Sequence, residues 1–255
     1  MHRFYLPPEQ CADTTLRLTG REAHHAAQVL RLQAGDRVAV LDGAGHEFHC
    51  EATKVAKREV LLRVVEKNFH PPLPARLTLV QAIPKGKTFD VIVQKATELG
   101  AHRVVPLLTE RVVTRLDEAR EAAHKREKWR QVAIESIKQC GSPWMPEITP
   151  PITLAQSLAS EARPEMSLVA ALAGERHHLR RHFARFQGEQ QRLPATISVW
   201  VGPEGDFTPK ELADLLAYGA LPITLGTNVL RAETAAICCL AVLGYELQAN
   251  STETA

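Results

Sequence analysis

Apolar and polar positions follow one pattern before residue 72 and another after it. The first part holds runs of strand length, and Asp42-Gly43 directly after one of them is a turn signal. One helix is expected near residues 21–30. The predicted strands are 37–41, 47–55 and 60–65. We therefore expect residues 1–72 to form a small β-rich unit, with the prolines at 71, 72 and 74 as a linker.

In residues 73–255, strand-like runs alternate with helical periodicity. Apolar residues recur at helical spacing over 89–99, and Gly100 can end that helix. Thr208-Pro209-Lys210-Glu211 fits a capping box with proline at the first helical position. The predicted strands are 76–83, 103–108, 167–172, 196–201 and 222–225; the predicted helices are 89–99, 118–140, 176–186, one from 209, and 231–247. The alternation predicts an α/β fold whose mostly parallel sheet is covered on both faces.

Bulk composition narrows the class only slightly. Lys and Arg total 31 against 29 Asp and Glu, a net charge of +2, so any basic face must be local. No run of 18 apolar residues predicts a membrane span, and residues 1–8 lack the apolar stretch of a secretory signal. The five cysteines include no C-x-x-C spacing. We therefore expect a cytoplasmic protein with reduced, buried thiols.

Ligands of parallel α/β sheets bind in the loops beyond the carboxyl ends of the strands. The segment Pro84-Lys85-Gly86-Lys87-Thr88 ends like a phosphate-binding loop, but Gln81 stands where the first glycine should be. No G-x-G-x-x-G follows a strand either. These absences argue against a nucleoside triphosphatase and against a dinucleotide-binding enzyme. His178 and His182 are four residues apart, without the Glu or Cys neighbours of a usual zinc site, so no metal is expected.

Two later loops carry a more specific signal. Gly202-Pro203-Glu204-Gly205 follows the strand 196–201, and the glycines allow close approach of the backbone to a ligand. Taken alone, this loop is equally compatible with an ordinary turn between a strand and a helix. The next predicted strand leads into L-G-x-x-x-L-R-x-E-T-A, residues 225–235.

Together these loops resemble the paired signature of the RsmE family of ribosomal RNA methyltransferases, which belongs to the SPOUT class. Further similar segments are Arg3-Phe4, Val29-Leu30-Arg31, Gly35-Asp36, residues 95–100 and Glu110-Arg111. The resemblance implies a PUA-like β-barrel over residues 1–72, followed over residues 73–255 by a SPOUT domain with a C-terminal trefoil knot. It implies transfer of a methyl group from S-adenosyl-L-methionine (SAM), without a metal, to N3 of a uridine in 16S rRNA, within the small ribosomal subunit.

The resemblance also assigns candidate site residues. The cofactor would contact Leu172, Gly202, Pro203, Glu204, Gly205, Leu225, Gly226, Leu230, Glu233 and Thr234. RNA would contact Arg3, Arg31, Lys85, Lys95 and Arg111, with Lys87, Arg115 and the cluster 125–130 as further cations. Charged runs on helices are more often simply solvated, and that alternative is favoured for 125–130. A homodimer is expected, since SPOUT relatives build each RNA site from two subunits and the apolar helix 231–247 suits packing against a partner.

Catalysis requires a group that accepts or offsets the proton lost from uracil N3. Arg231 can donate to a uracil carbonyl or to phosphate, or it can instead form an ion pair with Glu233 or Glu204 that holds the loops. Glu204 is the candidate proton acceptor, with Asp206 as an alternative. The target base must be unpaired or flipped out, because N3 lies on its Watson–Crick edge.

Two departures from the family pattern leave alternatives open. Asp206 stands where a second glycine is usual, and Gln139-Cys140 is not followed by the usual arginine. Trp144, close behind, can stack on a base or simply pack beside the prolines. The competing functions are a SPOUT enzyme with another RNA target and an RNA-binding assembly factor without catalysis.

Overall fold

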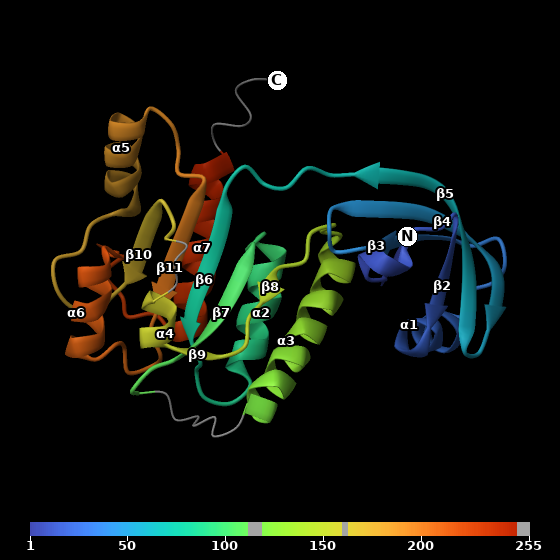
Figure 1. Cartoon of the computed structure of the whole chain (residues 1–255), viewed down its shortest axis with the longest axis horizontal. Coiled ribbons are helices and arrows are strands. Elements are labelled where there is room, and N and C mark those ends of the chain that lie inside the picture. Colours follow the sequence, from blue (N-terminus) through green and yellow to red (C-terminus); the bar gives the residue numbers. More distant parts are fainter. Residues whose placement is uncertain (112–118, 160–162, 249–255) are drawn as a thin grey trace. The chain divides into compact units, whose positions relative to one another are not determined.

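The computed structural model describes residues 1–111, 119–159 and 163–248, which fold into two compact units. The first unit contains residues 1–72 and 134–145, and the second contains the other described residues (Figure 1). None of the described helices is long and apolar enough to cross a membrane. Each unit has its own sheet and its own core.

The sheet of the first unit has five strands in the order β1-β3-β4-β5-β2. Their bounds are β1 His2–Tyr5, β2 Thr15–Thr19, β3 Arg37–Leu41, β4 His46–Ala56 and β5 Glu59–Phe69. Only β1 pairs in parallel, and β1 and β2 end the path, so the β-rich unit expected from the sequence is a half-barrel. Short helices η1 (Pro8–Gln10), α1 (Gly20–His24) and η2 (His25–Val29) complete it. Phe4, Leu16, Leu18 and Leu62 are fully buried between these elements.

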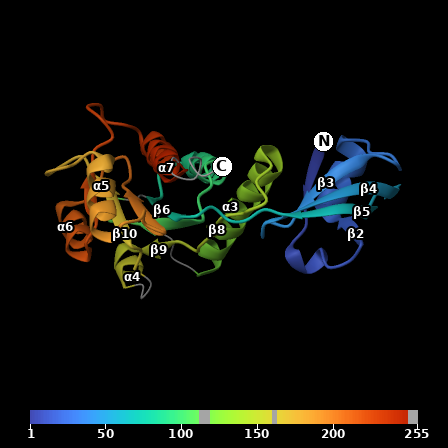
Figure 2. The same ribbon diagram turned by 90° about the horizontal axis from the view of Figure 1, so that it is seen from above.

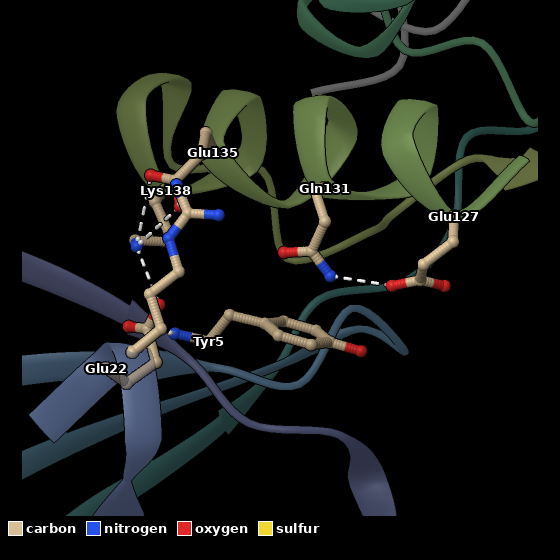
Figure 3. Close-up of polar contacts among 7 residues, drawn as sticks. Tyr5, Glu22, Glu127, Gln131, Glu135 and Lys138 are labelled. Carbon is tan, nitrogen blue, oxygen red and sulfur yellow. Dashed lines mark hydrogen bonds and ion pairs between the residues drawn. The ribbon is translucent and has the colours of Figure 1, made fainter. Parts of the chain in front are cut away.

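The last two turns of a long helix also belong to the first unit. Helix α3 runs from Ala119 to Cys140, and its Ile134 and Ile137 pack against Tyr5 and Leu41. Beside them, the buried Lys138 ammonium forms an ion pair with Glu22, at 2.8 Å, and with Glu135 (Figure 3). The predicted helix 118–140 is therefore confirmed from residue 119 on.

The sheet of the second unit has seven parallel strands, with the path β12-β10-β11-β6-β7-β8 and β9 paired to β7. The bounds are β6 Arg76–Ala82, β7 Arg103–Leu108, β8 Glu147–Ile148, β9 Ile152–Thr153, β10 Met166–Ala170, β11 Thr196–Val201 and β12 Leu221–Ile223. The parallel sheet predicted from the alternation is confirmed. Strands β6, β10 and β11 are almost entirely buried, as a sheet covered on both faces requires.

Helices cover both faces of this sheet. Helix α7 (Ala232–Gln248) packs on β6 and β11 together with α2 (Thr88–Glu98), while α4 (Leu154–Leu158) lies on the other face with α6 (Pro209–Tyr218) (Figure 2). The core on the α4 side contains Val80, Val105, Trp200, Phe207 and Leu215. Both hydrogen bonds of the predicted Thr208–Glu211 capping box are present.

One predicted helix begins later than its periodicity indicates. Helix α5 spans Leu179–Gln190 rather than 176–186. His177 instead bridges to Ile223 of β12, and the His178 side chain accepts a hydrogen bond from the Arg180 N–H as the helix cap. The segment 147–158, with β8, β9 and α4, was not predicted, because these elements contain only two to five residues each.

The cysteines are all free thiols. Cys11, Cys50 and Cys239 are buried, and burial raises the pKa of Cys11 and of Cys50 to about 12. Cys140 is exposed, which corrects the expectation that every thiol is buried: it is the last residue of α3, where the side chain reaches solvent.

Candidate functional site

The carboxyl ends of β12, β10, β11, β6 and β7 lie along one edge of the parallel sheet, because these strands are neighbours in this order. The loops that follow them carry most of the residues singled out in the sequence. The loop after β11 sits between the loops of β10 and β6. It is the centre of the candidate site.

The β11 loop is a tight turn that leads into α6. Gly202 and Pro203 are buried, whereas Glu204 and Gly205 are exposed. The Asp206 N–H donates to the Pro203 carbonyl oxygen at 2.9 Å, and Asp206 itself has φ +60°. This left-handed backbone favours glycine, and Asp and Asn are the side chains that adopt it most readily. The departure from the family pattern at residue 206 therefore keeps a backbone shape that glycine would also allow.

The Asp206 carboxylate connects two loops. Its Oδ2 accepts a hydrogen bond from the Leu172 N–H after β10, at 3.0 Å, and its Oδ1 accepts one from the Phe207 N–H at 2.8 Å. A methyl group added at Gly202 would lie 3.0 Å from Asp206 Oδ1 and 3.2 Å from the Phe207 nitrogen. The loop thus closes tightly on the glycine, and the carboxylate is already occupied by backbone donors.

Two residues proposed to contact RNA donate hydrogen bonds to this loop, Lys85 through its backbone and Arg111 through its side chain. The Lys85 N–H, after β6, donates to Glu204 Oε1 at 3.1 Å. The Arg111 guanidinium, after β7, donates to the Gly205 carbonyl oxygen, and its stem lies over Gly205. Loops from four neighbouring strands are therefore joined around residues 202–206.

A fully buried glutamine supports the loop from beneath. Gln81 is in β6, and its Nε2 donates to the Ala82 carbonyl oxygen at 2.9 Å, with the carbonyl oxygens of Val201 and Gly202 each at 3.4 Å. Its Oε1 is buried with no hydrogen-bond donor among the described residues. Sequence reasoning used Gln81 only to exclude a phosphate-binding loop. A polar residue inside an otherwise apolar buried strand was the signal for this role.

The second signature loop follows β12. Thr224 Oγ1 caps its turn at Gly226, whose φ of +118° suits glycine. Arg231 directly precedes α7 and is exposed, with no hydrogen bond or ion pair of its guanidinium among the described residues. The ion pairs with Glu233 and Glu204 that sequence analysis left open are therefore not formed in this structure. Glu233 is half-buried and Thr234 exposed in the first turn of α7.

Apolar side chains reach solvent at the same edge. Leu172 is 46% exposed and Val229 is 75% exposed, while Leu225 and Leu230 are half-buried. These residues flank backbone groups in the loops after β10, β11 and β12. Exposed apolar surface next to backbone polar groups matches what a ligand with an aromatic base and a polar ribose requires.

The remaining residues proposed to contact RNA are on other segments of the chain. Lys95 forms an ion pair with Glu98 on α2 at 2.7 Å. Arg3, in the first unit, stacks on Gly141 and donates to the Gln139 carbonyl oxygen at 3.4 Å. Arg31, also in the first unit, and Lys87 are exposed, and Arg115 lies outside the described residues.

The cationic cluster 125–130 is largely neutralised within the protein. Lys125 pairs with Glu121, Lys128 with Asp90, and Arg130 with Glu127.

Trp144 packs against Phe69 and Gly45, and its indole N–H donates to the His70 carbonyl oxygen at 3.0 Å. Its packing role therefore accounts for its position. Of the spaced histidines, His182 is buried against the Pro222 carbonyl oxygen, and burial lowers its pKa.

Comparison with known proteins finds a matching family model for each of the two units. A family model described as an RNA methyltransferase domain matches residues 71–244, and one described as an RNA methyltransferase PUA domain matches residues 18–65. Ribosomal RNA small subunit methyltransferase E of Synechocystis sp. is 34% identical over 97% of this chain and 78% of its own length. The same enzyme of Bacillus subtilis is 31% identical over 92% and 91%. A structure of ribosomal RNA small subunit methyltransferase E from Neisseria gonorrhoeae bound to S-adenosyl methionine is 26% identical, covers 96% and 98%, and superposes with a TM-score of 0.83.

Proposed function

Because the chain belongs to the family of ribosomal RNA small subunit methyltransferase E, we propose that it transfers a methyl group from SAM to N3 of a uridine in 16S rRNA. The observation that carries this proposal is the cluster of loops around residues 202–206, at the edge where a parallel sheet binds its ligands. The SAM-bound relative with the same fold supports the choice of methyl donor.

The residues at this edge fit the cofactor. The backbone of Gly202 to Gly205, Leu225 and Gly226 would offer polar groups to the adenosine, and Leu172 and Leu230 would cover its apolar faces. Pro203 in the β11 loop, and Glu233 and Thr234 in the first turn of α7, complete the set of residues that we propose to contact the cofactor. When bound, SAM supplies a methyl group attached to a positively charged sulfonium sulfur. Transfer of this methyl group by in-line displacement needs no metal. The protein therefore has to position the acceptor, and positioning supplies much of the rate.

Arg231 is the candidate for handling charge on the uracil. Its guanidinium is exposed and unpaired within the described residues, so it is available to donate to an oxygen of uracil as N3 loses its proton. Glu204 remains the candidate acceptor of that proton, since its carboxylate is exposed and accepts one hydrogen bond from the described part of the chain, from the Lys85 N–H. Asp206 is the weaker candidate, because both of its oxygens accept backbone hydrogen bonds.

The finer fold assignment is also part of this proposal. We assign residues 1–72 to RNA binding and residues 73–255 to a SPOUT methyltransferase domain with a C-terminal trefoil knot. The path of the chain supports the knot: among the strands, β12 has β10 as its described neighbour at the edge of the sheet, yet α7 begins nine residues later and packs on β11 and β6. An experimental electron-density map through residues 224–231 would test whether this segment passes through a loop.

We further propose that the protein acts as a cytoplasmic homodimer. Tyr245 on α7 is 70% exposed and Val229 before the helix is 75% exposed, and both are apolar surface that a second copy can cover. Light scattering at micromolar concentration should give twice the 28.2 kDa chain mass. A monomeric mass would contradict the dimer but leave the methyl-transfer proposal standing.

The direct test of function compares substrates. Purified protein and labelled SAM are incubated with small-subunit particles and with naked 16S rRNA, both from a strain lacking the modification, and the modified base is mapped. Methylation at N3 of one uridine is expected. Methylation of a different RNA or atom would favour another SPOUT activity. Absence of SAM binding by calorimetry would favour an RNA-binding assembly factor.

A further inference from the structure

A second concave site lies on the α4 side of the parallel sheet, toward the amino ends of its strands. Arg76 and Thr196 are the first residues of β6 and β11, and both line this cavity, whose volume is about 300 Å³. Thr78 and Ser198 line it as well, two residues further along each strand, because alternate residues face the same side. The loops of the candidate methyl-transfer site follow the opposite ends of these strands, so the two sites are distinct.

The rim of this cavity is cationic. Arg76, His102, Arg103 and Arg163 line it, and Glu147 is the one carboxylate among the described lining residues. Glu147 is already paired with Arg103 at 3.0 Å. Arg76 and Arg163 have no carboxylate within 4 Å among the described residues. The positive charge at this rim therefore lacks a full set of protein counter-ions.

The Arg163 guanidinium is held in place, and His102 adds an imidazole beside the arginines. The Arg163 guanidinium lies over the Tyr218 ring, 4.7 Å from its centroid. His102 is near both Arg76 and Arg103, and burial together with these charges lowers the pKa of its imidazole. An anion placed among these groups would relieve their mutual repulsion.

The floor combines hydroxyl groups with apolar side chains, among them Val80, Val105 and Ile197. Hydroxyls of Thr78, Ser157 and Thr196 line it, together with that of Ser198, which already donates to Ser167 Oγ at 3.1 Å. Beneath them, the indole N–H of Trp200 is buried and has no acceptor among the described residues. Donors on the floor and guanidinium groups on the rim are the combination that holds phosphate oxygens.

We propose that this cavity binds a phosphodiester of the RNA strand, as a second anchoring point remote from the methyl-transfer loops. The choice of RNA rests on the proposed function; the choice of phosphate rests on the cavity itself. Such an anchor would hold a segment of the substrate away from the target uridine and so contribute to affinity and register without touching the reacting atoms.

The test removes the two cations that lack carboxylate partners. The variant Arg76→Ala/Arg163→Ala is compared with wild type and with Arg185→Ala/Arg180→Ala, a matched control of equal charge change on α5, outside the cavity. Binding of a fluorescent 16S rRNA fragment is measured by anisotropy at several salt concentrations. The cavity variant should bind ~10-fold or more weakly, with a salt dependence reduced by about 1–2 in slope, while SAM affinity stays unchanged. The control should change far less.

Equal RNA affinity in the cavity variant and the control would overturn the proposal. If the double variant does not fold, as judged by thermal melting, Thr78→Val removes a floor hydroxyl at nearly constant shape, and the same affinity comparison is made. Titration with AMP and with inorganic phosphate is followed through the His102 imidazole NMR signal. It distinguishes a phosphodiester of RNA from a free nucleotide or free phosphate as the ligand of the cavity. Tight, saturable AMP binding that does not compete with RNA would replace the RNA assignment with a free-nucleotide site.

These outcomes separate from those of the proposed function. If the wild-type protein methylates 16S rRNA and the cavity variant binds RNA as tightly as wild type, the cavity proposal is refuted and the proposed function stands. Loss of RNA affinity in the cavity variant, in a protein that methylates no RNA, would support the cavity site and refute the enzymatic proposal.

Discussion

The Leu172 N–H donates to Asp206 Oδ2 at 3.0 Å, so one carboxylate links the loop after β10 to the loop after β11. Asp206 makes this contact with a left-handed backbone, at φ +60°. The residue that departs from the family pattern therefore stabilises the candidate cofactor site, rather than adding a free charge to it.

Substitutions at residue 206 should separate backbone strain from hydrogen bonding. Asp206→Asn keeps both an acceptor and the left-handed preference, Asp206→Gly keeps only the backbone freedom, and Asp206→Ala keeps neither. Relative to Asp206→Gly, the alanine variant should lose about 1–2 kcal/mol of unfolding free energy. Denaturant unfolding and SAM calorimetry on the series measure this. An alanine variant as stable as the glycine variant would contradict the role of the backbone.

Gly202→Ala should weaken SAM binding by at least ~10-fold, about 1.4 kcal/mol. The added methyl would lie 3.0–3.2 Å from Asp206 and Phe207, two of these contacts being with backbone atoms, so the loop must shift. Gly202→Val, with its larger side chain, should abolish binding. Gly188→Ala is the control, because its position on α5 is open and alanine favours the helix there. Normal SAM affinity in a folded Gly202→Ala variant would refute the prediction.

Arg231→Lys should lower single-turnover methylation by ~10- to 1000-fold, since it keeps the charge but loses the planar fork of donors. Melting temperature and SAM affinity should stay nearly unchanged, because Arg231 makes no ion pair among the described residues. The three measurements are made on one preparation. A lowered melting temperature with full turnover would assign Arg231 to bracing the loops.

Gln81→Glu should destabilise the second unit near neutral pH, because it places a carboxylate against the carbonyl oxygens of Ala82, Val201 and Gly202. Burial raises the folded-state pKa of the introduced carboxyl above its unfolded value, so the loss is full above the folded pKa and disappears as pH falls below the unfolded pKa. Gln81→Leu, which cannot titrate, is the control. Parallel stability curves for the two variants between pH 4 and 8 would exclude this explanation.

Lys138→Met should lower the unfolding free energy by about 3 kcal/mol, because it leaves Glu22 partly buried without its counter-ion. Glu22 also accepts from the Tyr5 N–H at 3.3 Å, a bond that Glu22→Gln can retain (Figure 3). The double variant should therefore recover part of the loss. Full additivity of the two single substitutions in denaturant unfolding would show that the pair contributes no coupling.

Local patterns were enough for much of the second unit. The strands 103–108 and 196–201 have the same bounds as the apolar runs that predicted them. Thr208 begins α6 through hydrogen bonds with Glu211, three positions along the chain. These features depend on side chains close in sequence, whose preferences act before any tertiary contact forms. The two signature loops could be found in the same way, because each directly follows a recognisable strand.

Other features were decided only by segments far apart in the chain. Helix α5 starts late because His177 pairs with Ile223 of β12, 46 residues further along the chain. Gln81 gains its role from β11, and residues 134–145 join the first unit by packing on Tyr5 and Leu41. None of these distant partners can be recognised from the residues next to the segment that they contact. Hydrophobic periodicity indicates that a face is buried, but the identity of what buries it is fixed only when distant strands and helices pack together.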